Sequence, residues 1–472
     1  MHVIVVGSGI AGLSAALSAA ENGARVTIAE RAAEGEHGGN TRYTEAYLRM
    51  KSIDEVADDF VDHFMANAGG YTDPSIEQEM VRDYADWSPL ARSQSTVDPD
   101  LLGAFVEKAG PTLRWLESNG LRFDFLPTAF ITTTTTRLLP VGGGLAMVET
   151  LTAACKEKGV DFRFETTAQS LLKTGGRVVG LATSRGDIEG DAVILASGGF
   201  EGNPEMLARY VGASAINLRP VARGGHYNKG EGIRMALAVG AAPNGDFGSY
   251  HAEPIDPRSG IAEPAIFTFP NGILVNKAGQ RFTDEAPGTV DAHYENVTRR
   301  IFEQRDGIAW LITDARLDEV PNWQKGCRTD QPPVTANSLG ELAQVLSLPA
   351  DVLSTTIESY NAACTEGSFK PLEKDGLSTK GLTPPKSNWA RPIDRTPFRA
   401  WPVISANVFT FGGLKVDRDG RVVDQDGRPI HGLYAAGETM GIYYRTYTGS
   451  TSVLRGAVFG RQAALHACGL SQ

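Results

Sequence analysis

Residues 2–30 read HVIVVGSGIAGLSAALSAAENGARVTIAE: a short β-branched run, a glycine-rich turn, an apolar helix and a second β-branched run. The two outer runs, 2–6 and 25–29, have the composition of buried parallel strands. Gly7 permits the tight turn, Gly9 lets the backbone approach a pyrophosphate, and Gly12 lets helix and strand pack closely. Glu30, after the second run, can accept hydrogen bonds from both hydroxyls of a ribose. The stretch therefore predicts a Rossmann-like dinucleotide-binding unit.

A second strand-to-glycine junction supports the same unit. DAVILASGGFEGN (191–203) is a buried strand that runs into glycines and an asparagine. Because ligands bind at the carboxyl ends of parallel strands, Ala196 and Gly198 are candidate cofactor contacts.

The length of 472 residues predicts two domains. Residues 51–127 look helical and amphipathic, and we interpret them as scaffold. From about residue 245 aromatics, prolines and short strand-like pieces alternate, ending in the proline-rich stretch 383–403, which is a plausible crossing between domains. We therefore predict a nucleotide domain in two parts, 1–245 and 405–472, with an inserted capping domain at 246–404.

Composition excludes several classes of function. The formal net charge of -11 argues against binding nucleic acid or an anionic membrane, and favours a small-molecule substrate. The four cysteines form no CxxC pair and are expected to be reduced thiols, neither a disulfide frame nor a metal site. The chain shows no targeting segment and no run long enough to span a bilayer, so a cytoplasmic location is expected.

A loop after the nucleotide motif, HGGNTR (37–42), begins a series of motifs that resembles one family. GSGIAG, HGGNTR, AVILASGGFEGN, GILVNKAGQRFTDE (272–285), FTFGGLKVD (409–417) and YAAGET (434–439) occur in the order found in FAD-dependent fumarate reductase and succinate dehydrogenase flavoproteins. The resemblance covers nearly the whole chain. It implies an α/β fold, with a Rossmann-like FAD-binding domain built from both chain ends and an inserted α+β cap. It also implies hydride exchange between FAD and a carbon–carbon bond beside a carbonyl or carboxylate.

The resemblance also implies which residues contact FAD. Gly38 and Gly39 let the backbone pass close under the flavin ring, while Asn40 and Thr41 donate to its polar edge or to the phosphates. Further contacts are expected at the ribityl chain and at the pyrimidine end of the flavin; these involve Gly437 and Glu438, and Ser452 and Val453, respectively. His37 does not match the position where relatives carry a covalently attached histidine, so we expect noncovalent FAD.

Three substrate-handling positions depart from the fumarate reductases. Thr289 and Val290 stand where those relatives carry the proton-donating arginine after the RFxxE motif. Phe409 replaces a histidine before the TxGG element, and Tyr447 replaces an arginine near the C-terminal glycines. An ordinary fumarate reductase mechanism is therefore not expected.

The replacements resemble the tricarballylate dehydrogenase branch, and a tyrosine before a glycine turn is also similar to 3-ketosteroid dehydrogenases. A small polycarboxylate is the first expected substrate, and a ketone the alternative. Candidate catalytic residues are Arg42 and Arg445 as carboxylate clamps, Tyr447 as a polarising or proton-relay group, and His251 as a substrate contact or base. Each has a structural alternative: a salt bridge for Arg42, a surface position for Arg445, and ordinary polar contacts for the other two.

Three other functions stay open at this point. They are an enoate reductase, a flavin-binding protein without turnover, and a NAD-dependent dehydrogenase, although the last leaves HGGNTR and YAAGET without a task. An enzyme of this kind needs an electron acceptor or donor, which the sequence does not identify. Arg281 and Glu285 of the RFTDE motif are expected to brace the cap as an ion pair.

Overall fold

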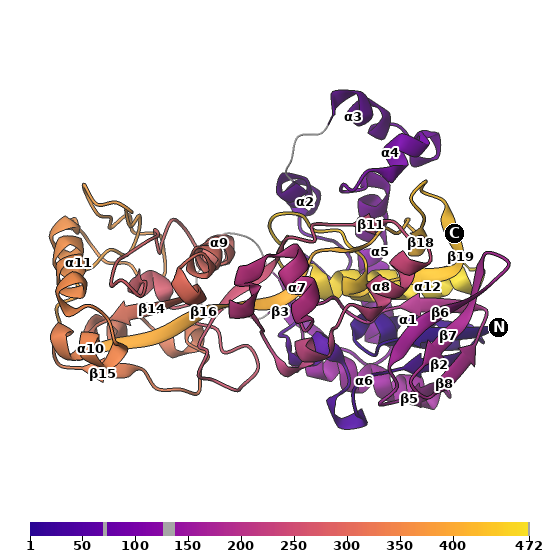
Figure 1. Cartoon of the computed structure of the whole chain (residues 1–472), viewed down its shortest axis with the longest axis horizontal. Helices are drawn as coiled ribbons and strands as arrows, with labels where there is room; N and C mark the ends of the chain where they lie inside the picture. Colours follow the sequence, from indigo (N-terminus) through magenta and orange to yellow (C-terminus); the bar gives the residue numbers. More distant parts are fainter. Residues whose placement is uncertain (69–72, 126–136, 471–472) are drawn as a thin grey trace.

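The computed structural model describes residues 1–68, 73–125 and 137–470. Its main sheet has six strands in the order β18-β19-β9-β1-β2-β5 (Figure 1). Every pairing in this sheet except β18 with β19 is parallel. The strands are β1 (His2–Val6), β2 (Arg25–Ala29), β5 (Asp161–Arg163), β9 (Ala192–Leu195), β18 (Arg421–Val423) and β19 (Pro429–Ala435). Both ends of the chain contribute strands, so the predicted two-part Rossmann-like unit is confirmed.

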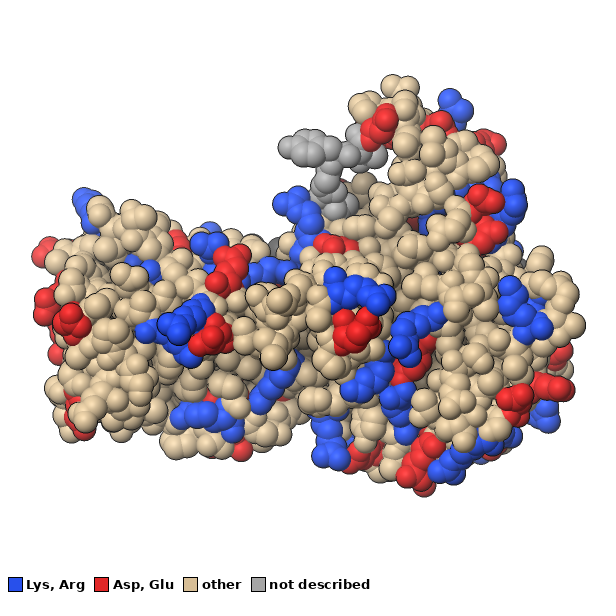
Figure 2. Space-filling view, viewed as in Figure 1, with Lys and Arg blue, Asp and Glu red and all other residues tan. Residues whose placement is uncertain are grey.

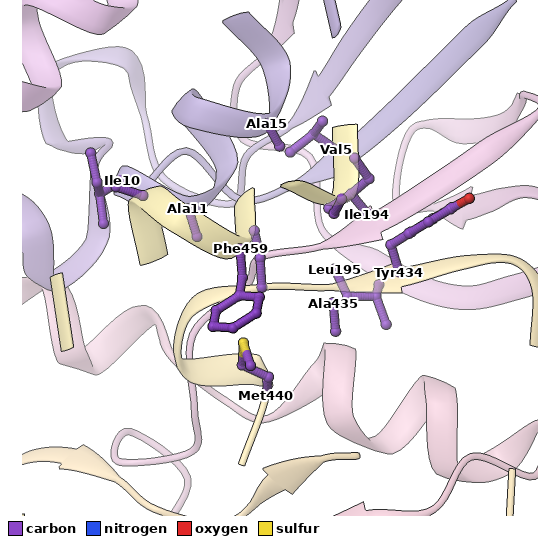
Figure 3. Packing of buried hydrophobic residues seen from close by; sticks show 14 of the residues in the cluster. Val5, Ile10, Ala11, Ala15, Ile194, Leu195, Tyr434, Ala435, Met440 and Phe459 are labelled. Atoms are coloured by element: carbon purple, nitrogen blue, oxygen red, sulfur yellow. The ribbon is translucent and has the colours of Figure 1, made fainter. Parts of the chain in front are cut away.

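Helices α1 and α12 cross at very short range beside this sheet. An added Cβ at Gly460 of α12 would lie 2.2 Å from the Ala11 carbonyl oxygen, and one at Gly456 would lie 2.7 Å from Ile10. Phe459 packs near Met440 and Ala11 in the same core (Figure 3). The crossing therefore places the N-termini of both helices next to each other. Helices α1 (Ile10–Glu21) and α12 (Ser452–Ala467) pack on the main sheet, and α6 (Gly143–Glu157) packs against α1.

The second large sheet is organised around the long strand β16 (Phe398–Thr410). It pairs in parallel with β10 and antiparallel with β12, β14 and β15, and β13 pairs with β14. The other strands are β10 (Arg219–Pro220), β12 (Tyr250–Ile255), β13 (Ile273–Val275), β14 (Ile308–Thr313) and β15 (Val334–Ala336), and the helices of this part are α9 (Val290–Phe302), α10 (Leu339–Leu346) and α11 (Ala350–Ala363). The boundaries of the cap stay a prediction, and β16 runs across the expected boundary at 404.

Within this part, Arg281 and Glu285 form the expected ion pair. Arg281 donates from Nε and Nη2 to the two Glu285 oxygens at 3.0 and 2.7 Å. The same carboxylate accepts the Leu274 amide at 3.0 Å, so the pair ties two segments of the lobe together.

The region 51–127 is mainly helical, as predicted, although residues 69–72 and 126–127 lie outside the described part. Its helices α2 to α4 project from the body of the molecule (Figure 1). The helices are α2 (Phe60–Ala68), α3 (Pro74–Met80), α4 (Pro89–Ser93) and α5 (Pro99–Ser118), followed by strand β3 (Phe123–Phe125). The remaining elements are β4 (Leu138–Pro140), β6 (Ala168–Thr174), β7 (Arg177–Thr183), β8 (Gly186–Glu189), α7 (Pro204–Tyr210), α8 (Glu231–Ala238), β11 (Pro243–Asn244) and β17 (Gly413–Leu414).

The surface carries charges of both signs. On the face shown in Figure 2, Lys and Arg are interspersed with Asp and Glu. Among the helices described, none is both long and apolar enough to cross a membrane.

The helix crossing predicts a contrast between two glycines. We expect Gly460→Ala to lower the free energy of unfolding by about 1–3 kcal/mol, because its Cβ would meet the Ala11 carbonyl. Gly103→Ala, inside α5 with no atom within 4 Å of the new Cβ, should be neutral or stabilising by up to about 1 kcal/mol. Thermal unfolding of both variants checks this, and equal shifts would contradict the close crossing.

Candidate active site

One large cleft runs from the carboxyl edge of the main sheet to the second sheet. Glu30 lines one end and His251 the other. The cleft therefore extends from the nucleotide motif to the second sheet.

The Glu30 end is built as the nucleotide motif predicts. Glu30 is buried and accepts hydrogen bonds from Ser8 N at 2.9 Å, Ser8 Oγ at 2.6 Å and Ala32 N at 2.7 Å. Gly7 has φ +98°, and a Cβ there would lie 2.4 Å from the Ala196 carbonyl oxygen. A side chain at Gly7 would therefore disturb the turn that leads a phosphate to the α1 N-terminus.

The HGGNTR loop closes over the start of α1. Gly38, at φ +109°, precedes the short helix η2 (Gly39–Tyr43). Thr41 Oγ1 accepts the Ile10 amide at 3.1 Å, so this hydroxyl caps α1. Asn40 lines the cleft and donates to Glu201 at 2.7 Å and to Val408 O at 2.9 Å. Its buried Oδ1 has no partner in the described residues, and is therefore free for a ligand.

Glycines and Glu438 line the middle of the cleft, and the buried Glu201 lies behind Glu438. Gly198 at φ +75° and Gly437 at φ +66° both line it. Glu438 accepts the Thr410 amide at 2.8 Å and lies beside the fully buried Glu201. Burial and the neighbouring Glu438 charge raise the pKa of Glu201 well above its usual range. The two carboxyls therefore carry about one negative charge between them at neutral pH.

His37 lies outside the cleft lining. Its Nδ1 contacts Glu34 O at 2.5 Å and its Nε2 contacts Thr152 Oγ1 at 2.9 Å. Both ring nitrogens are thus engaged in the protein, in keeping with the expectation that this histidine does not attach the flavin.

Tyr447 is anchored at the N-terminus of α12. Its hydroxyl accepts the amides of Thr451 at 2.9 Å and Ser452 at 3.0 Å, and lies 3.1 Å from Ser452 Oγ. Ser452 and Val453 line the cleft beside it. Because two amides occupy the oxygen lone pairs, the phenolic proton is directed to Ser452 or to a ligand.

His251 packs among three aromatic rings, those of Tyr447, Phe409 and Tyr294. The His251 ring centroid lies 4.5 Å from that of Tyr447 and 5.2 Å from that of Phe409, its cross-strand partner on β16. His251 Nε2 lies 2.6 Å from the Tyr294 hydroxyl, whereas its buried Nδ1 has no partner among the described atoms. Burial and the Arg299 charge lower the pKa of His251 to about 3. The ring is therefore neutral at physiological pH.

A carboxyl-rich group continues outward from His251. Glu253 Oε1 lies 4.0 Å from His251 Nε2, and Arg328 pairs with Glu263 at 2.8 Å and Glu45 at 3.0 Å. Burial and the charge of Glu263 raise the pKa of Glu253 well above its usual range, and burial raises the pKa of Glu263 to about 7. An additional negative charge is therefore unfavourable at this end of the cleft.

Two of the predicted substrate residues lie elsewhere. Arg42 does not line the cleft, and Arg445 is exposed, with φ +50° and its amide 3.3 Å from Asp246. The structure thus brings His251 and Tyr447 together but does not support the carboxylate clamp proposed for Arg42 and Arg445.

The cleft instead contains residues that sequence reasoning missed: Arg137, Glu253, Glu263, Tyr294, Arg328 and Arg455. Of these, only Glu253 could have been predicted from the sequence. It follows His251 by two residues on one strand, and residues two apart on a strand face the same side. A bulge between His251 and Ala252 modifies even that alternation.

The residues present fit FAD. Two helix N-termini open into the cleft, and the Glu30 carboxylate, of the kind that binds a ribose, stands at one end. Asn40 Oδ1 and Ser197 Oγ are buried without partners in the described structure, as expected for groups that await a cofactor.

Comparison with known proteins gives relatives along the whole chain. The NADH:acrylate oxidoreductase of Vibrio harveyi is 25% identical, over 98% of this chain and 50% of its own length. Vinyl phenol reductase of Lactiplantibacillus plantarum is 27% identical (94% and 91%), and 3-oxosteroid 1-dehydrogenase of Mycolicibacterium smegmatis is 27% identical (98% and 96%). The chain thus spans about half of one relative and nearly all of two others.

Solved structures share the fold. A flavocytochrome c3 fumarate reductase superposes with a TM-score of 0.75 at 23% identity, covering 99% of this chain and 78% of that one. The 3-ketosteroid delta1-dehydrogenase of Sterolibacterium denitrificans has a TM-score of 0.75 at 21% identity, covering 99% of both chains. The family model described as FAD binding domain matches residues 2–454. The chain therefore belongs to the FAD binding domain family, in the fumarate reductase and succinate dehydrogenase flavoprotein superfamily, and its cofactor is FAD.

Proposed function

We propose that the protein is an FAD-dependent oxidoreductase that desaturates, or in reverse reduces, a carbon–carbon bond beside a ketone carbonyl. The observation that carries the proposal is the Tyr447 hydroxyl, which two amides of α12 fix in the cleft lining while the Tyr447 ring packs 4.5 Å from the ring of His251. Bound FAD would supply hydride transfer to or from carbon. The relatives that act on enoates, a vinyl phenol and a 3-oxosteroid support this reaction class.

Tyr447 is suited to polarise a carbonyl. Its oxygen accepts two amides at the positive end of a helix, which favours donation of its own proton. A carbonyl oxygen placed against it would gain a hydrogen bond as negative charge develops on that oxygen.

Tyr294 and His251 form a second polar pair beside Tyr447. In the tautomer with a bare Nε2, Tyr294 O–H donates to His251 across 2.6 Å. Burial lowers the pKa of His251 and raises the pKa of Tyr294, so both groups stay neutral and would orient the substrate by hydrogen bonds.

A polycarboxylate of the tricarballylate type, the first expectation from the sequence, is a weaker candidate. Arg328 already pairs with Glu45 and Glu263, and Arg137 lies 3.2 Å from Asp291. Neither guanidinium group therefore has a free pair of N–H donors for a carboxylate of the substrate. The proposed residues thus favour a ketone.

Anaerobic mixing tests the proposal directly. We expect a cyclic ketone to bleach the oxidised flavin band in a single turnover, because two electrons pass to FAD without any external acceptor. Tricarballylate and succinate serve as comparisons. Bleaching by these acids and not by any ketone would contradict the proposal.

Two neighbouring tyrosines allow a matched test of polarisation. We expect Tyr447→Phe to lower kcat/KM by about 100-fold, the effect of removing one donor to a developing oxyanion. Tyr443→Phe is the control, because Tyr443 packs 5.2 Å from Tyr447 but bonds Thr451 Oγ1 and does not line the cleft. FAD content should be unchanged in both variants, and equal losses of activity would argue against a special role for Tyr447.

His251 should not produce a titration in the assay range. Since its pKa is lowered to about 3, the ring is uncharged from pH 5 to 9, and His251→Gln should preserve the shape of the kcat/KM profile. A limb near pH 7 that survives the substitution belongs with Glu263, whose pKa is raised to about 7. Loss of a limb between pH 6 and 7 in the variant would contradict the assignment of a neutral His251.

A further inference from the structure

The end of the cleft beyond His251 contains a carboxyl group without a partner. Glu253 is 8% exposed, and its Oε2 is buried with no hydrogen bond among the described residues. Its other oxygen faces His251 at 4.0 Å. Because buried polar atoms are nearly always bonded, a missing partner at a cleft wall indicates a group supplied by the ligand.

Arg328, the cation beside Glu253 and Glu263, is already paired. Arg328 donates from Nη1 to Glu263 and from Nη2 to Glu45, and its guanidinium stacks over Phe267 at 5.5 Å. A ligand carboxylate could reach this fork only by displacing one of the two glutamates. The guanidinium of Arg455 donates to Met440 O and stacks on Tyr443 at 4.7 Å, on the side of α12.

The carboxyls themselves oppose an anion. Burial raises the pKa of both Glu253 and Glu263; the charge of Glu263 also raises that of Glu253, and the charge of Glu45 that of Glu263, which means that added negative charge is unfavourable here. A ligand carboxylate would meet the same desolvation and the same repulsion. The rings of Phe267, Phe409 and Tyr294 offer an apolar wall instead.

We infer that this end of the cleft selects an uncharged, ring-bearing carbonyl compound whose hydroxyl group bonds Glu253, and that it excludes compounds with a carboxylate there. A hydroxyl can donate to Oε2 and accept from a protonated carboxyl, so it matches Glu253 in either state. This inference rests on the proposed function, because it places the carbonyl at Tyr447.

Four cyclohexanones that differ at C4 test the inference: the unsubstituted ketone, 4-hydroxycyclohexanone, 4-aminocyclohexanone and 4-oxocyclohexanecarboxylate. Binding to the FAD-loaded protein is followed by the change in the flavin spectrum and by calorimetry. We expect the hydroxy ketone to bind roughly tenfold more tightly than the unsubstituted ketone, and the carboxylate to bind more weakly than both.

Binding and bleaching separate the two proposals. Preference for the hydroxy ketone without bleaching contradicts the proposed function alone. Bleaching with preference for the carboxylate contradicts the inference alone. Preference for the amine, with a proton released from Glu253 in calorimetry, would replace the hydroxyl by an ammonium and overturn the inference, as would a failure of all four compounds to bind.

Variants locate the effect. Glu253→Ala should reduce the hydroxy-to-unsubstituted affinity ratio to about one, and Glu263→Gln, which releases one arm of Arg328, should raise affinity for the carboxylate roughly tenfold. Glu303→Ala is the control: it removes an exposed glutamate just after α9, paired with Arg300. An unchanged ratio in Glu253→Ala with normal FAD content would overturn the assignment. The wild-type series remains decisive should that variant fail to fold.

Discussion

The contact between α1 and α12 determines where the chemistry can take place. Gly456 and Gly460 let α12 approach the Ile10–Ala11 backbone closely, and Gly437 at φ +66° fits against Ala11 from the loop before α12. Two helix N-termini from opposite ends of the chain thus open into one cleft. The first suits a pyrophosphate, and the second holds Tyr447 through its amides. No local sequence pattern indicates that the pyrophosphate site and Tyr447 lie close together. The helix crossing brings them together.

Several glutamates with raised pKa values lie close together in the cleft wall and behind it. The pairs Glu201 with Glu438 and Glu253 with Glu263 are buried next to each other, which raises the pKa of at least one member in each pair. A protonated carboxyl can donate as well as accept. Glu201 of the first pair accepts from the side-chain amides of Asn40 and Asn228 at 2.7 and 2.6 Å, so it positions the HGGNTR loop against the cleft. Both members of the second pair line the cleft.

Sequence reasoning recovered the parts of the site that depend on local geometry. The strand–turn–helix of residues 2–30, the HGGNTR loop and the α12 N-terminus all lie on the cleft, because backbone shape there is encoded by neighbouring glycines. It did not recover Tyr294, Arg328 or Glu263, which reach the cleft from a helix and two loops of the second sheet's lobe. Arg42 was misplaced for a related reason: in a 3-10 turn, its neighbours Thr41 and Tyr43 face the cleft while its own side chain does not. Side-chain direction in a short irregular turn cannot be read from spacing alone.

The loss of cationic residues at positions 409 and 447 and the presence of carboxyl groups with raised pKa values near His251 are linked. The superfamily resemblance expects an arginine where Tyr447 stands and a histidine where Phe409 stands, and either cation would attract ionised glutamates. With a phenol and a phenyl ring there instead, Glu253 lies beside a neutral His251 and has no ion pair among the described residues. Burial holds the pKa of its carboxyl well above the usual range, so this carboxyl retains its proton more readily than an exposed one. A substrate that must enter the space beside Glu253 is therefore selected for the absence of charge as much as for its shape, and the carbonyl to be polarised must rely on hydrogen bonds from Tyr447 and not on an arginine.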